Sequence, residues 1–135
     1  MAATAGYSGT PLVRKLGIKS GMRVALVSAP SDFRRLLVGL PGDVRLSDRA
    51  AGSPDLGVWF VTRRRELDRR IEALAGCLGH ALWIAWPKKT SGVETDLTED
   101  VVRNVGLARG LVDYKVCAID ATWSGLKFAR RRPLR

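Results

Sequence analysis

The sequence predicts an α/β protein with a three-layer Rossmann-like fold, in which a mostly parallel sheet ends in an antiparallel hairpin. Short apolar runs alternate with helical patterns along the chain, which is typical of a parallel sheet with helices on both faces. The runs at 22–28, 58–62 and 81–86 are apolar almost throughout, as strands buried on both faces must be. The last two strand-like runs are too close together for a parallel crossover, so they predict a hairpin.

In the first half of the chain, capping residues, glycine and proline mark where each element begins and ends. The expected elements are a helix from Pro11 to Gly17 with Thr10 as cap, a strand at 22–28, a helix at 32–40 with Ser31 as cap, and strands at 44–47 and 58–62. The connection between the last two must cross over the first strand with about ten residues, fewer than such a crossover normally uses. This connection is the weakest step in the predicted topology.

The second half contains the best-defined helix, in which Leu67, Ile71 and Leu74 recur at helical spacing. Asp96 and Glu99 have the spacing of a capping box at the start of another helix. The remaining elements are strands at 81–86, 114–120 and 126–130. The predicted strand order is 44–47, 22–28, 58–62, 81–86, 126–130, 114–120, with 126–130 antiparallel to its neighbours.

Composition favours a single domain over residues 1–135, with an ordered core at about 10–130 and a basic tail at 130–135. The chain has 135 residues, 46% of them hydrophobic, which suffices for a core. The longest apolar run, ALWIAW, is far shorter than the ~20 residues of a membrane span. The start, MAATAGYSG, lacks the pattern of a signal peptide. We therefore expect a cytoplasmic protein with no membrane partner.

Few residues carry the chemistry of a metal or catalytic site. Cys77 and Cys117 are the only cysteines, and we expect both to be free and buried. His80 is the sole histidine, so neither a usual zinc site nor a Ser-His-Asp arrangement is favoured. We expect no metal and assign no catalytic residue. The net charge of +10 favours polyanion partners such as nucleotides or nucleic acid, unless it serves solubility alone.

Four stretches, LGIKSGMRVALV, GHALWIAWP, GLVDYKVCAID and SGLKFARR, resemble parts of a shortened methyltransferase-like Rossmann fold. The resemblance implies that a cofactor-binding member would have a glycine-rich turn after the first strand. Here the turn at 28–32 reads SAPSD, without glycine, and Pro30 lacks an N–H that could donate to a ligand. We therefore expect no S-adenosylmethionine and no other cofactor.

Further stretches that are long and specific are GYSGTPL at 6–12, WPKKTSG at 86–92, TDLTEDVVR at 95–103 and TWSGLK at 122–127. In these stretches the chain resembles an uncharacterised bacterial family named domain of unknown function 3052. The family has no assigned activity, so the resemblance implies no reaction.

A ligand site is expected beyond the carboxyl ends of the strands, where open α/β sheets bind ligands. The segments that should meet there contribute Ser28, Ser31, Asp32, Asp48, Arg63, Arg64, Arg65, Trp86, Lys88, Lys89, Asp120, Trp123 and Ser124. Asp48 follows Ser28 at about the spacing of a ribose-binding acid. Asp120 is either an ion-pair partner of Lys88 or a general base.

The WPKKTSG loop is the candidate anion site. Lys88 and Lys89 would meet a phosphate as point charges. Ser91 and the Gly92 N–H would donate hydrogen bonds to it, near the positive end of the following helix. Trp86 would stack on a base. The alternative is a solvated loop, with the tryptophans of this edge packed in the core.

Arg63, Arg64 and Arg65 open a helix, where each cation opposes the helix dipole by roughly 0.3–1 kcal/mol. A bound anion or nearby carboxylates would relieve that cost. The alternative is a plain solvated helix face.

These observations favour a small non-enzymatic binding protein that holds an anionic ligand, phosphate-bearing, nucleotide or nucleic acid, at the carboxyl edge of the sheet. Two alternatives stay open. One is an interaction or scaffold domain, which forms a homodimer through an edge strand or docks its arginine-rich helix on an acidic protein partner. The other is a degenerate methyltransferase-like enzyme, in which Asp48 or Asp120 acts as an acid or base.

Overall fold

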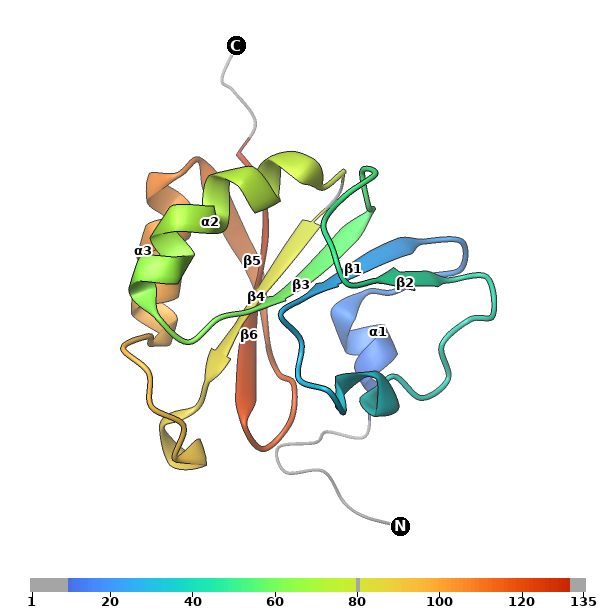
Figure 1. Cartoon of the computed structure of the whole chain (residues 1–135), viewed down its shortest axis with the longest axis horizontal. Coiled ribbons are helices and arrows are strands. Elements are labelled where there is room, and N and C mark those ends of the chain that lie inside the picture. The colour runs from blue at the N-terminus through green and yellow to red at the C-terminus, as the bar shows by residue number, and fades with distance from the viewer. Residues whose placement is uncertain (1–9, 80, 132–135) are drawn as a thin grey trace.

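The computed structural model of the chain describes residues 10–79 and 81–131 (Figure 1). The predictions for residues 6–9, His80 and the tail at 132–135 lie outside the described residues. The elements in chain order, with η for a 3-10 helical turn, are α1 (Leu12–Leu16), β1 (Arg23–Val27), η1 (Phe33–Leu36), β2 (Arg45–Ser47), β3 (Leu56–Phe60), α2 (Arg64–Cys77), β4 (Ala81–Pro87), η2 (Lys89–Ser91), α3 (Glu99–Ala108), β5 (Leu111–Ala118) and β6 (Trp123–Arg130).

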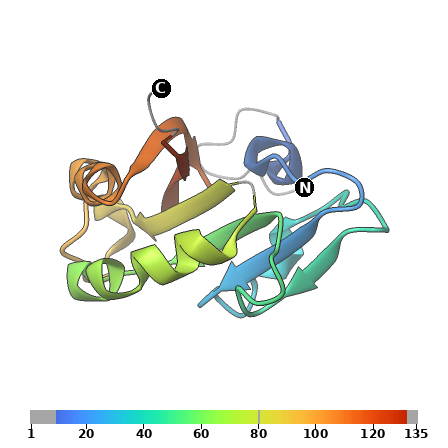
Figure 2. The same cartoon turned by 90° about the horizontal axis from the view of Figure 1, so that it is seen from above.

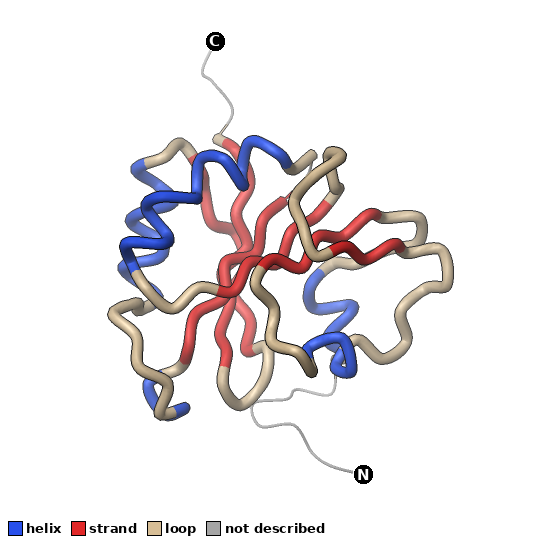
Figure 3. Tube along the Cα trace, viewed as in Figure 1, coloured by secondary structure: helices blue, strands red, loops and turns tan. Residues whose placement is uncertain are grey.

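Six strands form one sheet in the order β2-β1-β3-β4-β6-β5. Figure 3 shows the strands in red at the centre of the molecule. β1 runs parallel to β2 and β3, and β3 runs parallel to β4. β6 is antiparallel to both β4 and β5, so the last two strands form a hairpin. The predicted strand order and strand directions are confirmed, and the protein has an α/β Rossmann-like fold.

The connection from β2 to β3 crosses β1 without a helix. Residues 48–55 are enough because the chain turns sharply at Gly52 and Ser53, whose backbones are left-handed with φ of 74° and 55°. Arg23 in β1 fixes this connection. Its backbone N–H donates to the Asp55 carboxylate at 2.8 Å, and its guanidinium donates to the Gly52 carbonyl. An irregular segment held to the strand that it crosses therefore completes the weakest step of the predicted topology.

Each face of the sheet carries its own apolar core (Figure 2). α2 and α3 cover one face, where Ile71 is completely buried. α1 and η1 cover the other face, where Leu16 is completely buried. Along β4 the side chains alternate, so that Trp83 lies in the α1 core and Ile84 in the α2–α3 core. This is the three-layer arrangement that the apolar strands predict.

The helix expected at 32–40 is wrong, because this segment contains only the short turn η1. Asp32 precedes the turn without a capping hydrogen bond from its side chain, and Gly39 has a left-handed backbone with φ of 84°. A right-handed helix does not continue through such a residue. Thr10 does not cap α1 either, since Pro11 occupies the cap position.

None of the helices within residues 10–79 and 81–131 has the length and apolar character needed to cross a membrane. Cys77 and Cys117 are free, as expected, but Cys77 is exposed rather than buried. Burial raises the pKa of the half-buried Cys117 thiol. A thiol with a raised pKa is a poor nucleophile at neutral pH, so Cys117 is not a candidate catalytic group.

Candidate functional site

The carboxyl ends of the strands meet at one edge of the sheet, as the topology predicts. β1, β3 and β4 are parallel, and the β5–β6 turn reaches the same edge because Trp123 pairs with Pro87 at the end of β4. The N–H of Lys88 continues this contact by donating to the Thr122 carbonyl at 2.7 Å. The side chains, however, divide between a cleft beside β1 and β2 and a surface of ion pairs beside α2.

A cleft of about 320 Å³ lies beyond the ends of β1 and β2. It is lined by Leu26, Ser28, Ala29, Pro30, Ser31, Arg34 and Asp48. The strand order reverses at β1, with β2 on one side and β3 on the other, and nucleosides bind at such a switch point in open α/β sheets. The volume lies at the lower end of the about 300–1,000 Å³ that small-molecule sites occupy.

The turn after β1 has a left-handed backbone at Ser28, with φ of 56°. Glycine adopts this conformation freely, and other residues adopt it at a cost of about 1–2 kcal/mol. Ser28 therefore makes the kind of turn that the absent glycine would make. Phe33 anchors the end of this loop, since it is 1% exposed and packs edge-on against Phe60 with 4.8 Å between ring centroids.

Asp48 is the carboxylate of the cleft and directly follows β2. Its Oδ1 accepts a hydrogen bond from Arg34 Nη2 at 2.9 Å. Both side chains are well exposed, 50% for Arg34 and 84% for Asp48, and such surface pairs contribute about 0–1 kcal/mol. A ligand hydroxyl can therefore compete for this carboxylate at little cost.

The WPKKTSG loop uses two of its predicted ligand groups, Trp86 and Ser91, within the protein. Trp86 is only 5% exposed and packs in the α2–α3 core, so its ring offers no face to a base. Lys89 belongs to η2, which ends at Gly92 in a left-handed conformation with φ of 79°. Ser91 Oγ donates to the Lys88 carbonyl at 2.7 Å and accepts from the N–H two residues on at 3.1 Å. The ammonium groups of the two lysines are what this loop can offer to an anion.

The arginine run at 63–65 faces carboxylates from the segment that precedes α3. Arg63 Nη2 pairs with Glu94 Oε1 at 3.2 Å. Asp96 Oδ1 accepts a hydrogen bond from the backbone N–H of Arg64 at 2.8 Å, at the start of α2. The sequence suggests that a bound anion or nearby carboxylates offset the unfavourable interaction of these arginines with the helix dipole. Nearby carboxylates are present.

The capping box expected for α3 is wrong. α3 begins at Glu99, and its cap is Thr98, whose hydroxyl accepts from the Val101 N–H at 3.2 Å. Asp96 instead binds the start of α2, which the local sequence cannot show because the bonded residues are 32 positions apart.

We expect Asp96→Ala to lower the free energy of unfolding by about 1–2 kcal/mol, because it removes a hydrogen-bond acceptor and a negative charge from the start of α2. Urea unfolding measures this change. Glu94→Ala is the matched control, since Glu94 is 88% exposed and contacts the same helix start through a side-chain ion pair, which is worth about 0–1 kcal/mol. Equal losses in the two variants would contradict a specific role for the Asp96 hydrogen bond.

The hairpin residues predicted at this edge have structural contacts. The Trp123 ring packs edge-on against Phe60 at 5.0 Å on the α1 side of the sheet, the opposite side from Trp86. Asp120 Oδ1 accepts hydrogen bonds from the backbone N–H groups of Thr122 and Trp123, both at 2.8 Å. Asp120 thus shapes the hairpin turn, and within the described residues it forms no ion pair with a lysine.

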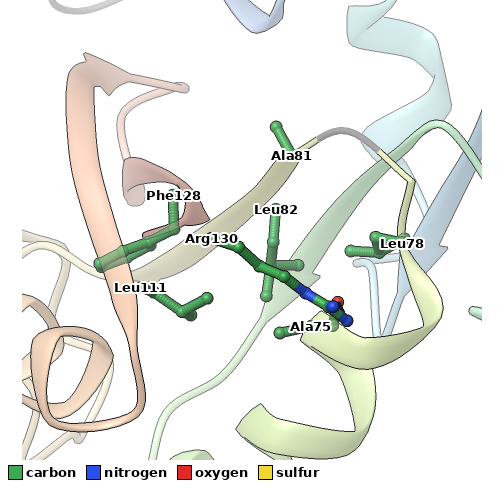
Figure 4. A pocket seen from close by; sticks show the side chains of 7 residues that line it. All are labelled: Ala75, Leu78, Ala81, Leu82, Leu111, Phe128 and Arg130. Carbon is green, nitrogen blue, oxygen red and sulfur yellow. Dashed lines mark hydrogen bonds between the residues drawn. The ribbon is translucent and has the colours of Figure 1, made fainter. Parts of the chain in front are cut away.

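Two of the hollows elsewhere on the described residues are less suited to a ligand with hydroxyl groups. At the C-terminal end of α2, a cavity of about 20 Å³ has room for one water molecule. Arg130 reaches across it and donates to the Ala75 carbonyl at 3.2 Å (Figure 4). A hollow of about 370 Å³ lies between α1 and residues 38–41. Neither has a carboxylate in its lining, and no metal-binding group of three or more His, Cys, Asp or Glu occurs within the described residues.

No family model and no curated protein matches the chain, so the resemblance to domain of unknown function 3052 is unsupported. Solved structures do match. A ribosomal protein methylase from Lactobacillus delbrueckii subsp. bulgaricus is 14% identical with a TM-score of 0.57, over 90% of this chain and 76% of that chain. Magnesium protoporphyrin IX methyltransferase from Synechocystis, with bound S-adenosylhomocysteine (SAH), is 12% identical with a TM-score of 0.59, over 87% and 78% of the two chains.

These neighbours correct the expectation that the chain takes no cofactor. The Synechocystis enzyme has been solved with SAH and also with S-adenosylmethionine (SAM) bound, so a protein of this fold does hold that cofactor. In this chain it is Ser28, rather than a glycine, that adopts a left-handed backbone in the turn after β1. At such low identity the likeness establishes the fold alone, and this chain has the methyltransferase-like Rossmann fold.

Proposed function

We propose that the chain is a methyltransferase-like domain that binds an adenosine-containing ligand of the SAM class in the cleft beyond β1 and β2. The observation that carries the proposal is that the left-handed turn at Ser28 and the Asp48 carboxylate line one cleft. In Rossmann-like folds a tight turn after the first strand lets the backbone approach the ligand, and an acid about 20 residues on accepts hydrogen bonds from the ribose.

The cleft has polar and apolar side chains that could contact the different parts of such a ligand. Asp48 would accept hydrogen bonds from the ribose hydroxyls in place of Arg34, and Arg34 would then be free to face a ligand carboxylate. Leu26 and Ala29 would give apolar contact to the adenine. Pro30 donates no backbone hydrogen bond, so we expect weaker binding than a glycine-rich turn would allow.

When bound, SAM supplies an activated methyl group. Among the residues that line the cleft, Asp48 is the only carboxylate and no histidine, lysine or cysteine is present. The proposal therefore concerns binding and orientation of the ligand rather than a particular methyl transfer.

Isothermal titration with SAH tests this function. We expect Asp48→Asn, which keeps the side-chain shape, to raise the Kd about tenfold to a hundredfold, because hydrogen bonds to a charged group contribute about 1.5–3 kcal/mol. Arg34→Ala frees the Asp48 carboxylate but also removes an exposed contact to the ligand carboxylate, so the Kd should stay within about fivefold.

The matched control is Asp43→Asn. Asp43 also lies beside β2, but before the strand, and it accepts from the Ser20 hydroxyl at 2.6 Å rather than lining the cleft. This variant should bind SAH as the unmodified chain does. No heat of binding at millimolar SAH, or equal effects of the two Asn variants, would contradict the proposal.

An anion site at Lys88 and Lys89 is a second candidate, favoured by the absence of a carboxylate partner for either side chain among the described residues. ATP and inorganic sulfate are suitable probes. If ATP binding is lost in the Lys88→Ala, Lys89→Ala double variant and kept in Asp48→Asn, the anion site is supported and is separate from the cleft.

A further inference from the structure

Two lysines of the β5–β6 hairpin and one lysine that follows α1 lie on the α1 side of the hairpin. The strand register places Lys115 directly opposite Lys127. Burial lowers the pKa of Lys127, and the charges of Lys115 and of Lys19, just after α1, lower it further. Like charges directly opposite each other destabilise a strand pair. This arrangement is therefore electrostatically unfavourable in the chain alone.

Lys127 is held in place without a carboxylate. It is 9% exposed, and its Nζ donates to the Leu16 carbonyl at 3.3 Å. The rings of Trp83 and Tyr114 each lie 5.7 Å from the ammonium, within the range of a cation–π contact. All ion pairs between described residues use arginine, so Lys19, Lys115 and Lys127 have no acidic partner there.

A bulge in β5 brings an aromatic ring to the same place. The register shifts between Asp113 and Lys115, which leaves Tyr114 as the extra residue, and bulges re-aim the side chain that they carry. Tyr114 contacts Lys127 and yet is 56% exposed. Lys115, the next residue, is exposed, and so is Lys19. We call the surface of Lys19, Tyr114, Lys115 and Lys127 the lysine face.

An exposed ring among unneutralised cations suits single-stranded nucleic acid, in which bases stack on aromatic side chains and phosphates meet basic groups. An acidic peptide that adds a strand to the β5 edge is the competing occupant. The bulge disfavours it, because an added strand needs a regular row of backbone groups. We propose that the lysine face binds single-stranded nucleic acid, with a base stacked on Tyr114 and phosphates at Lys115 and Lys19.

The test is fluorescence anisotropy with a labelled single-stranded RNA 12-mer of mixed sequence, titrated at several salt concentrations. We expect Tyr114→Ala to weaken binding about fivefold to a hundredfold, the effect of losing one stacked base. Lys115→Gln should weaken binding and lower the slope of log affinity against log salt by about 0.7, the effect of losing one phosphate contact in a single strand.

The matched control is Arg45→Gln, which removes one positive charge at an exposed residue of β2, the opposite edge of the sheet from β5. It should change the affinity less than about twofold. Equal losses in Lys115→Gln and Arg45→Gln, together with no effect of Tyr114→Ala, would mean a response to net charge only and would overturn the proposal. Tighter binding of a labelled polyglutamate peptide than of RNA, with the same dependence on Tyr114, would also overturn it in favour of a protein partner.

The proposed binding of nucleic acid to the lysine face does not involve the cleft beyond β1 and β2. Variants of the lysine face should leave the Kd for SAH unchanged, and Asp48→Asn should leave the affinity for RNA unchanged. Failure of one proposal is therefore distinguishable from failure of the other.

Discussion

We expect Trp83→Ala to lower the free energy of unfolding by about 3–5 kcal/mol, the range for truncating a large buried aromatic side chain. The Trp83 side chain is completely buried in the α1 core. Its Nε1 also donates to the Leu16 carbonyl at 2.8 Å, across 67 positions of sequence. The substitution removes the centre of this core and a hydrogen bond that holds α1 to the sheet.

A pair of conservative variants separates the hydrogen bond from the packing. Trp83→Phe keeps an aromatic ring but loses the N–H. It should therefore lower the free energy of unfolding through the lost packing of the larger ring and by about 1 kcal/mol more for the lost hydrogen bond. Trp59 is equally buried, but its Nε1 has no hydrogen-bond partner among the described residues, so Trp59→Phe loses ring volume and no hydrogen bond. If urea unfolding finds the two Phe variants equally destabilised, the Leu16 hydrogen bond contributes nothing measurable.

The same glycine-to-alanine change should have opposite effects in the two long helices. A Cβ added at Gly106 of α3 would lie 2.8 Å from Phe128 Cζ, 2.9 Å from Cδ1 and closer still to Cε1. Phe128 is 1% exposed and packed in the α2–α3 core, and the cavity of about 20 Å³ that it lines is too small to take the displaced ring. We expect Gly106→Ala to destabilise the protein by about 1–3 kcal/mol, as overpacking does.

Gly76 in α2 is the matched position. The nearest atom to an added Cβ there is Arg130 Nη2, the end of a flexible side chain, at 3.7 Å. Gly76→Ala should therefore stabilise the protein by up to about 1 kcal/mol through helix propensity. Thermal or urea unfolding of both variants measures the difference. A stabilising Gly106→Ala would show that α3 can move away from β6 at little cost.

The sheet could be predicted from sequence because the buried strands appear as short apolar runs in the local sequence. The runs at 58–62 and 81–86 are apolar on both faces, and that pattern requires a buried parallel sheet whatever the rest of the chain does. The segment 32–40 has caps and stops of the same apparent quality, but its backbone turns left-handed at Gly39. Glycine adopts right-handed and left-handed backbone conformations about equally readily. The local sequence therefore does not show which one Gly39 adopts in the packed structure.

The candidate site was only partly predictable for a similar reason. The spacing of Ser28 and Asp48 indicated a ribose acid, and the two residues do line one cleft. The conformation of Ser28 was not predictable, since serine rarely adopts it. The lysine face was missed entirely, because Lys19, Lys115 and Lys127 come together only through the strand register and the docking of α1.

The double hydrogen bond at the Leu16 carbonyl has a consequence for the order of folding. Its donors, on Trp83 and Lys127, lie 67 and 111 positions along the chain. Contacts across such separations form only after long loops have closed. α1 precedes both donors along the chain, so these two hydrogen bonds complete its docking only after β4 and β6 are in place. Its apolar side chains, Leu12 among them, can pack earlier against β1 and β3, which contribute to the same core.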